Sequence, residues 1–142
     1  MGRIGYRDYA ISGICEFENF PECLENPTEI ELERRREVKW FMKLQKVENM
    51  TTHFRPEIYF KHSFDEVQIG FWVHFNVETN TKRRFPSYDK IIHRSSVPVY
   101  SAHTFEISKV LENFDEWLTD GAFCVEYGIH VESKKMASAR KN

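Results

Sequence analysis

The sequence has few of the residues that mark several common classes of protein. Only three of its 142 residues are Cys, and none form a Cys-x-x-Cys pair, which argues against a disulfide framework and a structural zinc site. Five Pro and six Gly are too few for a fibrous or disordered chain. No glycine-rich phosphate loop and no apolar run of membrane-spanning length occurs. A formal net charge of −2 argues against a dedicated nucleic-acid binder.

The compartment is predicted from the same absences. The cysteine count is odd and no secretory signal is recognisable, so a reducing environment fits the chain better than an oxidising one. We therefore expect a cytoplasmic or nuclear protein.

Aromatic residues and alternating segments are what the sequence has in abundance. Aromatic residues make up 15% of the chain, with 12 Phe among them. In residues 67–77, apolar side chains alternate with Gln68, Gly70, Trp72, His74 and Asn76; the apolar set is Ile69, Phe71, Val73, Phe75 and Val77. This alternation predicts a strand with one face in the core.

Further strands are predicted by the same alternation in residues 14–20, 38–44, 57–61 and 122–131. Residues 25–37 contain many helix formers but also alternate, and we favour a strand and loop there. Residues 80–88 form a basic, turn-rich loop, and Asp120-Gly121 is a turn signal. A short helix is expected near residues 106–118.

These elements predict an all-β protein, an antiparallel β-sandwich of about seven or eight strands. At 142 residues the chain has the size of one domain. We expect a lead-in at 1–13, the domain at 14–132, and a flexible basic tail at 133–142.

The order of the segments resembles the MATH (meprin and TRAF homology) family, whose sandwich fold is shared with TRAF C-terminal domains. The likeness runs from about residue 11 to residue 132. It is carried by the segments CEFENF, VKWFMKL, EIYFK and VQIGFWVHFNV, and most closely by residues 103–131. The resemblance implies a domain without catalytic activity that binds an extended peptide or a partner surface in a shallow groove. In this family the module is often joined to a BTB domain that recruits a cullin ubiquitin ligase, to a deubiquitinase, or to a TRAF coiled coil.

Groove positions follow from the resemblance residue by residue. Tyr59 matches a groove tyrosine of a substrate adaptor in the family, and Val73 stands where that adaptor has a groove phenylalanine. Tyr100-Ser101-Ala102 stands where the adaptor has Trp-Gly-Phe, so part of the aromatic floor differs, and His103 follows. Trp72, on the polar face of its strand, is either an exposed binding residue or is covered by residues 80–88. The expected groove residues are Tyr59, Trp72, Val73, Tyr100, Ser101 and His103.

Catalytic and metal sites have weaker support in the sequence. The six His show no metal-binding spacing, so no metal or cofactor is expected. Ser101 and His103 share a strand face, but no strained turn presents a nucleophile, and Cys124 lies within a strand. Trp40 is expected in the core because it alternates with apolar neighbours. We expect no enzymatic activity.

The sequence thus favours a protein–protein interaction module, with substrate recognition for a ubiquitin ligase as one form of it. A cullin-ligase context would apply only if the module were joined to a BTB domain. One alternative is a C2-like sandwich that binds anionic membranes through Lys82, Arg83 and Arg84; another is the targeting domain of a deubiquitinase. With an acidic total charge, we interpret the basic cluster as a solvated loop and do not expect nucleic-acid or membrane partners.

Overall fold

The computed structural model describes residues 11–35, 38–62, 66–94 and 98–137. Its elements in chain order are β1 (Ile11–Phe17), the 3-10 helix η1 (Glu22–Leu24), β2 (Ile30–Arg35), β3 (Val38–Val47), β4 (Met50–His62), β5 (Glu66–Glu78), β6 (Arg84–Arg94), β7 (Val99–Tyr100), β8 (Phe105–Glu106), α1 (Ile107–Glu112), α2 (Phe114–Trp117) and β9 (Phe123–Ala137). Strands dominate the described part of the chain, as the alternating segments predicted.

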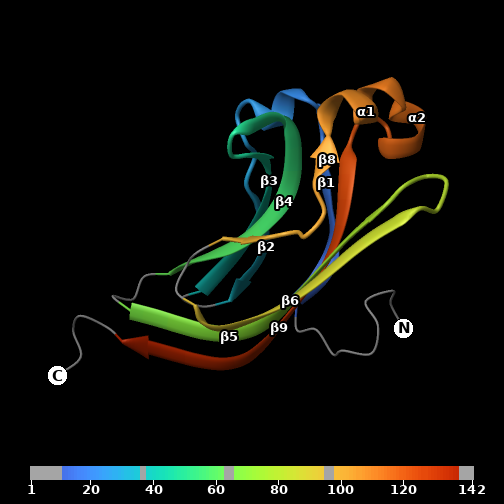
Figure 1. The fold of residues 1–142 in the computed structure, drawn as a ribbon. Coiled ribbons are helices and arrows are strands. Elements are labelled where there is room, and N and C mark those ends of the chain that lie inside the picture. Colours follow the sequence, from blue (N-terminus) through green and yellow to red (C-terminus); the bar gives the residue numbers. More distant parts are fainter. Residues whose placement is uncertain (1–10, 36–37, 63–65, 95–97, 138–142) are drawn as a thin grey trace.

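The strands form two sheets, which face each other across the core (Figure 1). The four-stranded sheet has the order β1-β9-β5-β6, and the five-stranded sheet has the order β2-β3-β4-β7, with β8 also paired to β4. Every ladder between named strands is antiparallel. The predicted antiparallel sandwich is confirmed. Some ladders join consecutive strands, as in β3–β4 and β5–β6, and others join strands far apart in the sequence, as in β1–β9.

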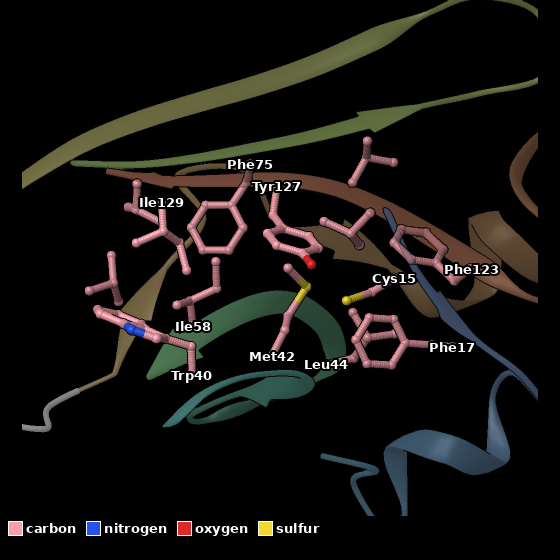
Figure 2. Packing of buried hydrophobic residues seen from close by; sticks show 14 of the residues in the cluster. Cys15, Phe17, Trp40, Met42, Leu44, Ile58, Phe75, Phe123, Tyr127 and Ile129 are labelled. Atoms are coloured by element: carbon pink, nitrogen blue, oxygen red, sulfur yellow. The ribbon is translucent and has the colours of Figure 1, made fainter. Parts of the chain in front are cut away.

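The core lies between the inward faces of the two sheets. Figure 2 shows Phe75, Tyr127 and Ile129 of the four-stranded sheet pointing toward Trp40 and Met42 of the other. Trp40 is 2% exposed and packs its ring 5.1 Å from those of Phe60 and Phe71; its predicted place in the core is confirmed. Burial of these rings supplies much of the free energy of folding, because each removes a large apolar area from water.

Two turns show how local sequence sets the strand connections. Asp120 and Gly121 both have positive φ (51° and 82°), and Thr119 and Ala122 exchange backbone hydrogen bonds of 2.9 Å around them. This is the geometry of a two-residue hairpin with both central residues left-handed, which Asp-Gly tolerates. Asn49, with φ 65°, likewise turns β3 back into β4. The turn predicted at Asp120-Gly121 is confirmed.

Several predicted boundaries differ from the structure. β1 begins at Ile11, inside the expected lead-in, and β9 continues through residues 133–137, expected in the tail, because they pair with β5. Residues 84–88 are strand rather than loop, since β6 pairs with β5 from Arg84. The rest of the expected lead-in and tail, 1–10 and 138–142, lies outside the described residues.

The helical part also differs in detail. The expected helix near 106–118 is divided into α1 and α2, because Asn113 departs from helical geometry with φ −125° and ψ 47°. Both lie at one end of the sandwich, beside the turn between β5 and β6 (Figure 1). In the described part of the chain, no helix is long and apolar enough to cross a bilayer.

Candidate functional site

The outer face of the five-stranded sheet presents aromatic rings among charged side chains. Because side chains alternate across a strand, Phe41 of β3 and Tyr59 of β4 point away from the core while Trp40 and Phe60 point into it. Phe41 and Tyr59 are register partners, and their rings stack with centroids 5.7 Å apart. Tyr100 of β7 continues the face on the other side of β4 and is 40% exposed. We call the surface formed by Phe41, Tyr59 and Tyr100, with the charged residues between them, the tyrosine face.

Glu29 fixes one end of the tyrosine face. The Tyr59 hydroxyl donates a short hydrogen bond to Glu29 Oε2, and Lys61 Nζ lies 2.9 Å from Oε1 of the same carboxylate. The hydrogen bonds from Tyr59 and then Lys61 lower the pKa of Glu29. Burial is the main cause that raises the pKa of Tyr59, and the hydrogen bond to Glu29 raises it further. The Tyr59 hydroxyl therefore stays protonated and acts as a donor. Both side chains are held in place before any ligand arrives.

Glu57 lies at the centre of the tyrosine face, between Tyr59 on its own strand and Tyr100 on β7. It is 3% exposed, and its Oε2 is 3.6 Å from Lys43 Nζ. Burial raises the pKa of Glu57, against the lowering effect of Lys43 and of the hydrogen bond with Tyr100. Among the described residues, Glu57 Oε1 has no hydrogen-bond partner. A buried carboxylate with one unsatisfied oxygen costs stability, and such costs are often retained at binding sites.

Arg55 lies beside Tyr100, at the end of the tyrosine face opposite Glu29. Its guanidinium carbon lies 4.0 Å from the centre of the Tyr100 ring, a cation–π contact that holds the ring against the sheet. Burial has the largest effect in raising the pKa of Tyr100. The negative charge of Glu57 and the hydrogen bond with Glu57 raise this pKa further. Tyr100 therefore presents an amphipathic ring whose orientation is set by two neighbours.

Ser101 and His103, two of the expected groove residues, join the sheets instead of lining the tyrosine face. Ser101 is buried, its backbone N donates to Pro56 O at 3.0 Å, and its Oγ accepts from the backbone N of His103 at 3.1 Å. His103 Nε2 donates to Pro86 O at 2.8 Å, on β6 of the other sheet. The His103 ring is thus engaged by a carbonyl, and the Ser–His pair has no hydroxyl-to-imidazole hydrogen bond of the kind that activates a nucleophile.

Val73 and Trp72 occupy different places from the one expected. Val73 is 1% exposed in the core, because it shares the inward face of β5 with Phe71 and Phe75, so its assignment to a groove is wrong. Trp72 is half-buried on the outer face of the four-stranded sheet. Its indole N–H donates to Glu132, and Lys90 Nζ lies 5.0 Å from the centre of its ring. Lys90, rather than residues 80–88, covers it.

The cysteines, the histidines and acids, and the basic turn do not form a further reactive or metal site in the described part of the chain. Burial raises the pKa of the Cys15 thiol to about 12 and also raises that of Cys124, which makes both poor nucleophiles at neutral pH. Within residues 11–35, 38–62, 66–94 and 98–137, no group of three or more His, Cys, Asp or Glu side chains could hold a metal ion. In the basic turn, Lys82 pairs with Glu78 at 3.8 Å and Arg83 with Glu116 at 3.1 Å, so acids partly neutralise it.

The fold is an antiparallel sandwich of the TRAF type. The chain is similar in structure to TRAF5 of Notothenia coriiceps, with a TM-score of 0.60 and 13% sequence identity over 92% of this chain and 77% of that chain. No protein-family model and no curated protein sequence matches the chain. At this identity the likeness shows the fold, and the predicted TRAF-like sandwich is confirmed.

Sequence reasoning missed several members of the tyrosine face. Arg55 fell outside the expected strand at 57–61, although His53, Arg55, Glu57 and Tyr59 continue its alternation back through β4. Phe41 lies on the same side of its strand as Lys39 and Lys43, and its pairing with Tyr59 comes from the register between β3 and β4. Glu29 precedes β2 and reaches Tyr59 only through the tertiary structure. A longer alternation window would have found Arg55.

Proposed function

We propose that this chain is a protein-interaction module of the MATH type that binds an extended segment of a partner protein across the tyrosine face. The observation that carries the proposal is the position of Tyr59 and Tyr100 on either side of Glu57, on the outward face of a TRAF-like sandwich. Tyrosines supply large contact area at low entropic cost and are enriched among binding hot spots. Tyr100 is the exposed ring of the pair at 40%, whereas Tyr59 is 9% exposed.

The partner would gain affinity from several sources on this face. An apolar side chain can pack on the Phe41 and Tyr59 rings, while Lys43 and Lys61 lie within 5.5 and 4.7 Å of the Tyr59 and Phe41 ring centres respectively. Such lysines can contact an acidic or carbonyl oxygen of a bound peptide while their stems cover the rings. A partner would therefore meet residues whose positions are already set by their hydrogen bonds and ring contacts in this chain.

A more specific form of the proposal is that the module recognises substrates for a ubiquitin ligase. In that form it would belong to a longer protein whose BTB domain recruits a cullin ligase. Targeting of a deubiquitinase is an alternative form of the same proposal. Both rest on the resemblance to the MATH family, and both would place the protein in the cytoplasm or nucleus. Membrane binding through the basic turn is less well supported, because Lys82 and Arg83 each have an acidic partner.

A peptide-display selection tests the proposal. The wild-type domain is expected to enrich a short motif, and a Tyr59→Ala, Tyr100→Ala double variant is expected to lose it while remaining folded. Tyr88→Ala serves as the matched control, since Tyr88 is a 60% exposed tyrosine on the opposite sheet. Enrichment of the same motif by the double variant would contradict the proposal.

A further inference from the structure

A hollow lies at the helical end of the sandwich, beyond the Arg55 end of the tyrosine face. It has a volume of about 270 Å³. We infer that this pocket is a separate binding site for an apolar side chain that a partner protein carries next to a carboxylate. The floor consists of aromatic and aliphatic groups from β6, β8, α1 and α2, and the rim carries cations. Its named residues are Phe85, Phe105, Val110, Trp117, Arg83 and Lys109.

The floor of the pocket is apolar and rigid. The rings of Phe85 and Trp117 stack 5.4 Å apart, and Phe105 meets Trp117 edge-on at 5.7 Å. Phe105 is buried and also contacts the core ring of Phe123 at 5.6 Å. Because the floor is continuous with the core, an inserted side chain would bury its surface against groups that do not need to rearrange.

The wall is held by a clamp between the β5–β6 turn and α2. The backbone N of Asn80 donates to Glu116 O at 2.8 Å, and its side-chain amide donates to the carbonyls of Asp115 at 2.7 Å and Leu118 at 3.1 Å. The Thr81 hydroxyl donates to the Glu116 carboxylate at 2.8 Å. This network fixes the position of α2 relative to β6, so the pocket is formed in the free protein.

The rim carries Arg83, Lys109 and the acid Glu106, and an anion would be attracted by Lys109. The Arg83 guanidinium lies over both Phe85 and Trp117, 5.4 and 5.6 Å from the ring centres, where Glu116 holds it at 3.1 Å. Lys109 is exposed and has no ion pair with the described residues. The acid in the lining, Glu106, accepts a hydrogen bond from Ser108 at 3.2 Å. A carboxylate beside the inserted side chain would complement the unpaired ammonium of Lys109.

The dimensions of the pocket favour a peptide over a free small molecule. Its volume lies below the roughly 300–1,000 Å³ of most small-molecule sites, and it opens to the surface. His53, at its margin, is two residues from Arg55 of the tyrosine face, which corresponds to about 7 Å along a strand. A capped tripeptide is long enough to reach both, so substitutions at Lys109 and Tyr100 decide which site it occupies.

The test uses the full chain and acetyl- and amide-capped Ala-Phe-Glu, followed by NMR of the Trp117 indole N–H. Saturable shifts of this resonance are expected, weaker with Ala-Phe-Gln and weakest with Ala-Phe-Lys. Lys109→Glu should weaken binding of Ala-Phe-Glu by about tenfold, because an attractive charge becomes repulsive. Lys82→Glu, in the turn between β5 and β6 and 82% exposed, is the control for a change of surface charge outside the lining and should change affinity little.

Two results would overturn the pocket assignment. One is an unshifted Trp117 resonance, or equal affinity for all three peptides. The other is loss of tripeptide binding in Tyr100→Ala with binding retained in Lys109→Glu, which would place the ligand on the tyrosine face and leave the proposed function intact. Failure of the tyrosine-face selection, with Lys109-dependent tripeptide binding retained, would instead refute the proposed function and support the pocket.

Discussion

The outer faces of the two sheets both carry tyrosine, yet they are built differently. On the five-stranded sheet, Tyr59 and Tyr100 flank Glu57, a buried carboxylate with one oxygen unsatisfied among the described residues. On the four-stranded sheet, Tyr88 stacks on the His74 ring at 4.3 Å and an interplanar angle of 9°, and leaves His74 fully buried. On one face a buried carboxyl group lies between two tyrosines, and on the other a tyrosine ring covers a buried imidazole.

The contrast shows that exposed aromatic residues alone do not identify a binding surface. Tyr88, at 60% exposed, is more accessible than Tyr100 at 40%, but its ring closes over a neighbour as part of the sheet's own packing. Tyr100 is held by Arg55 and Glu57, groups that can also bond to a ligand. The tyrosine face is therefore the better candidate, because the exposed ring of Tyr100 is positioned by groups that can also contact a ligand.

The largest expected effect comes from the core that both faces share. Trp40→Ala should lower the free energy of unfolding by about 3–5 kcal/mol, because it removes a buried indole between Phe60 and Phe71. Urea denaturation followed by circular dichroism would measure it. The matched control is Phe41→Ala, the next residue on the same strand but on the outer side, which should cost less than half as much. Equal losses would contradict the assignment of Trp40 and Phe41 to opposite faces.

A smaller effect should distinguish the tyrosine face by its response to pH. The pKa of Glu57 is raised above its ordinary value of 4.5, so the folded state binds this proton more tightly than the unfolded state. Its contribution to stability is fully present below pH 4.5 and is lost as the pH rises through the raised pKa. Glu57→Gln should remove this dependence and raise the stability at pH 7 relative to pH 4.5, compared with the wild type. Urea midpoints at pH 4.5, 6 and 8 check it, and an unchanged slope would refute the assignment.

His74 should act in the opposite direction. Burial lowers its pKa from 6.5, against the raising effect of Glu126, so the unfolded state binds this proton more tightly. Its contribution is fully present above pH 6.5 and is lost as the pH falls through that value toward the lowered pKa. Tyr88→Ala, which uncovers the ring, should move the His74 pKa back toward 6.5 in an NMR titration. A His74 pKa unaffected by this substitution would contradict the covering role of Tyr88.

The smallest effect is expected at Lys90, on the four-stranded sheet. It lies over the Trp72 ring and 3.8 Å from Glu132, but its side chain is 44% exposed. Lys90→Ala should therefore change stability by less than about 1 kcal/mol and leave binding at the tyrosine face unaltered. Thermal unfolding and a binding titration measure both quantities. A clear loss of affinity would move the binding surface to the opposite sheet.

Alternation predicted the strands and the inward side chains, because a strand that buries one face must place apolar residues at every second position. The same alternation put Val73 beside Phe71 and Phe75 in the core; its assignment to a groove came from the family resemblance and overrode that pattern. Strand periodicity could not predict the partners of Trp72, since Lys90 and Glu132 come from different strands. Nor could it predict that residues 133–137, in which polar and apolar residues do not alternate, would pair with β5.

The burial of Glu57 shows the same limit. Its place on the outward side of β4 follows from the period of the strand, and an outward carboxylate is expected to be solvated. It is buried because Lys43, on β3, and Tyr100, on β7, close over it from both sides. Contacts of this kind depend on sheet order, which a single sequence does not contain.

The most direct test of the central claim is a calorimetric titration of a display-selected peptide into two matched variants. Tyr100→Ala should weaken binding by about tenfold or more, the loss typical of a hot-spot aromatic, while Tyr88→Ala should leave the affinity within about twofold of wild type. The opposite order, with Tyr88→Ala impaired and Tyr100→Ala unchanged, would contradict the account and place the binding surface on the four-stranded sheet.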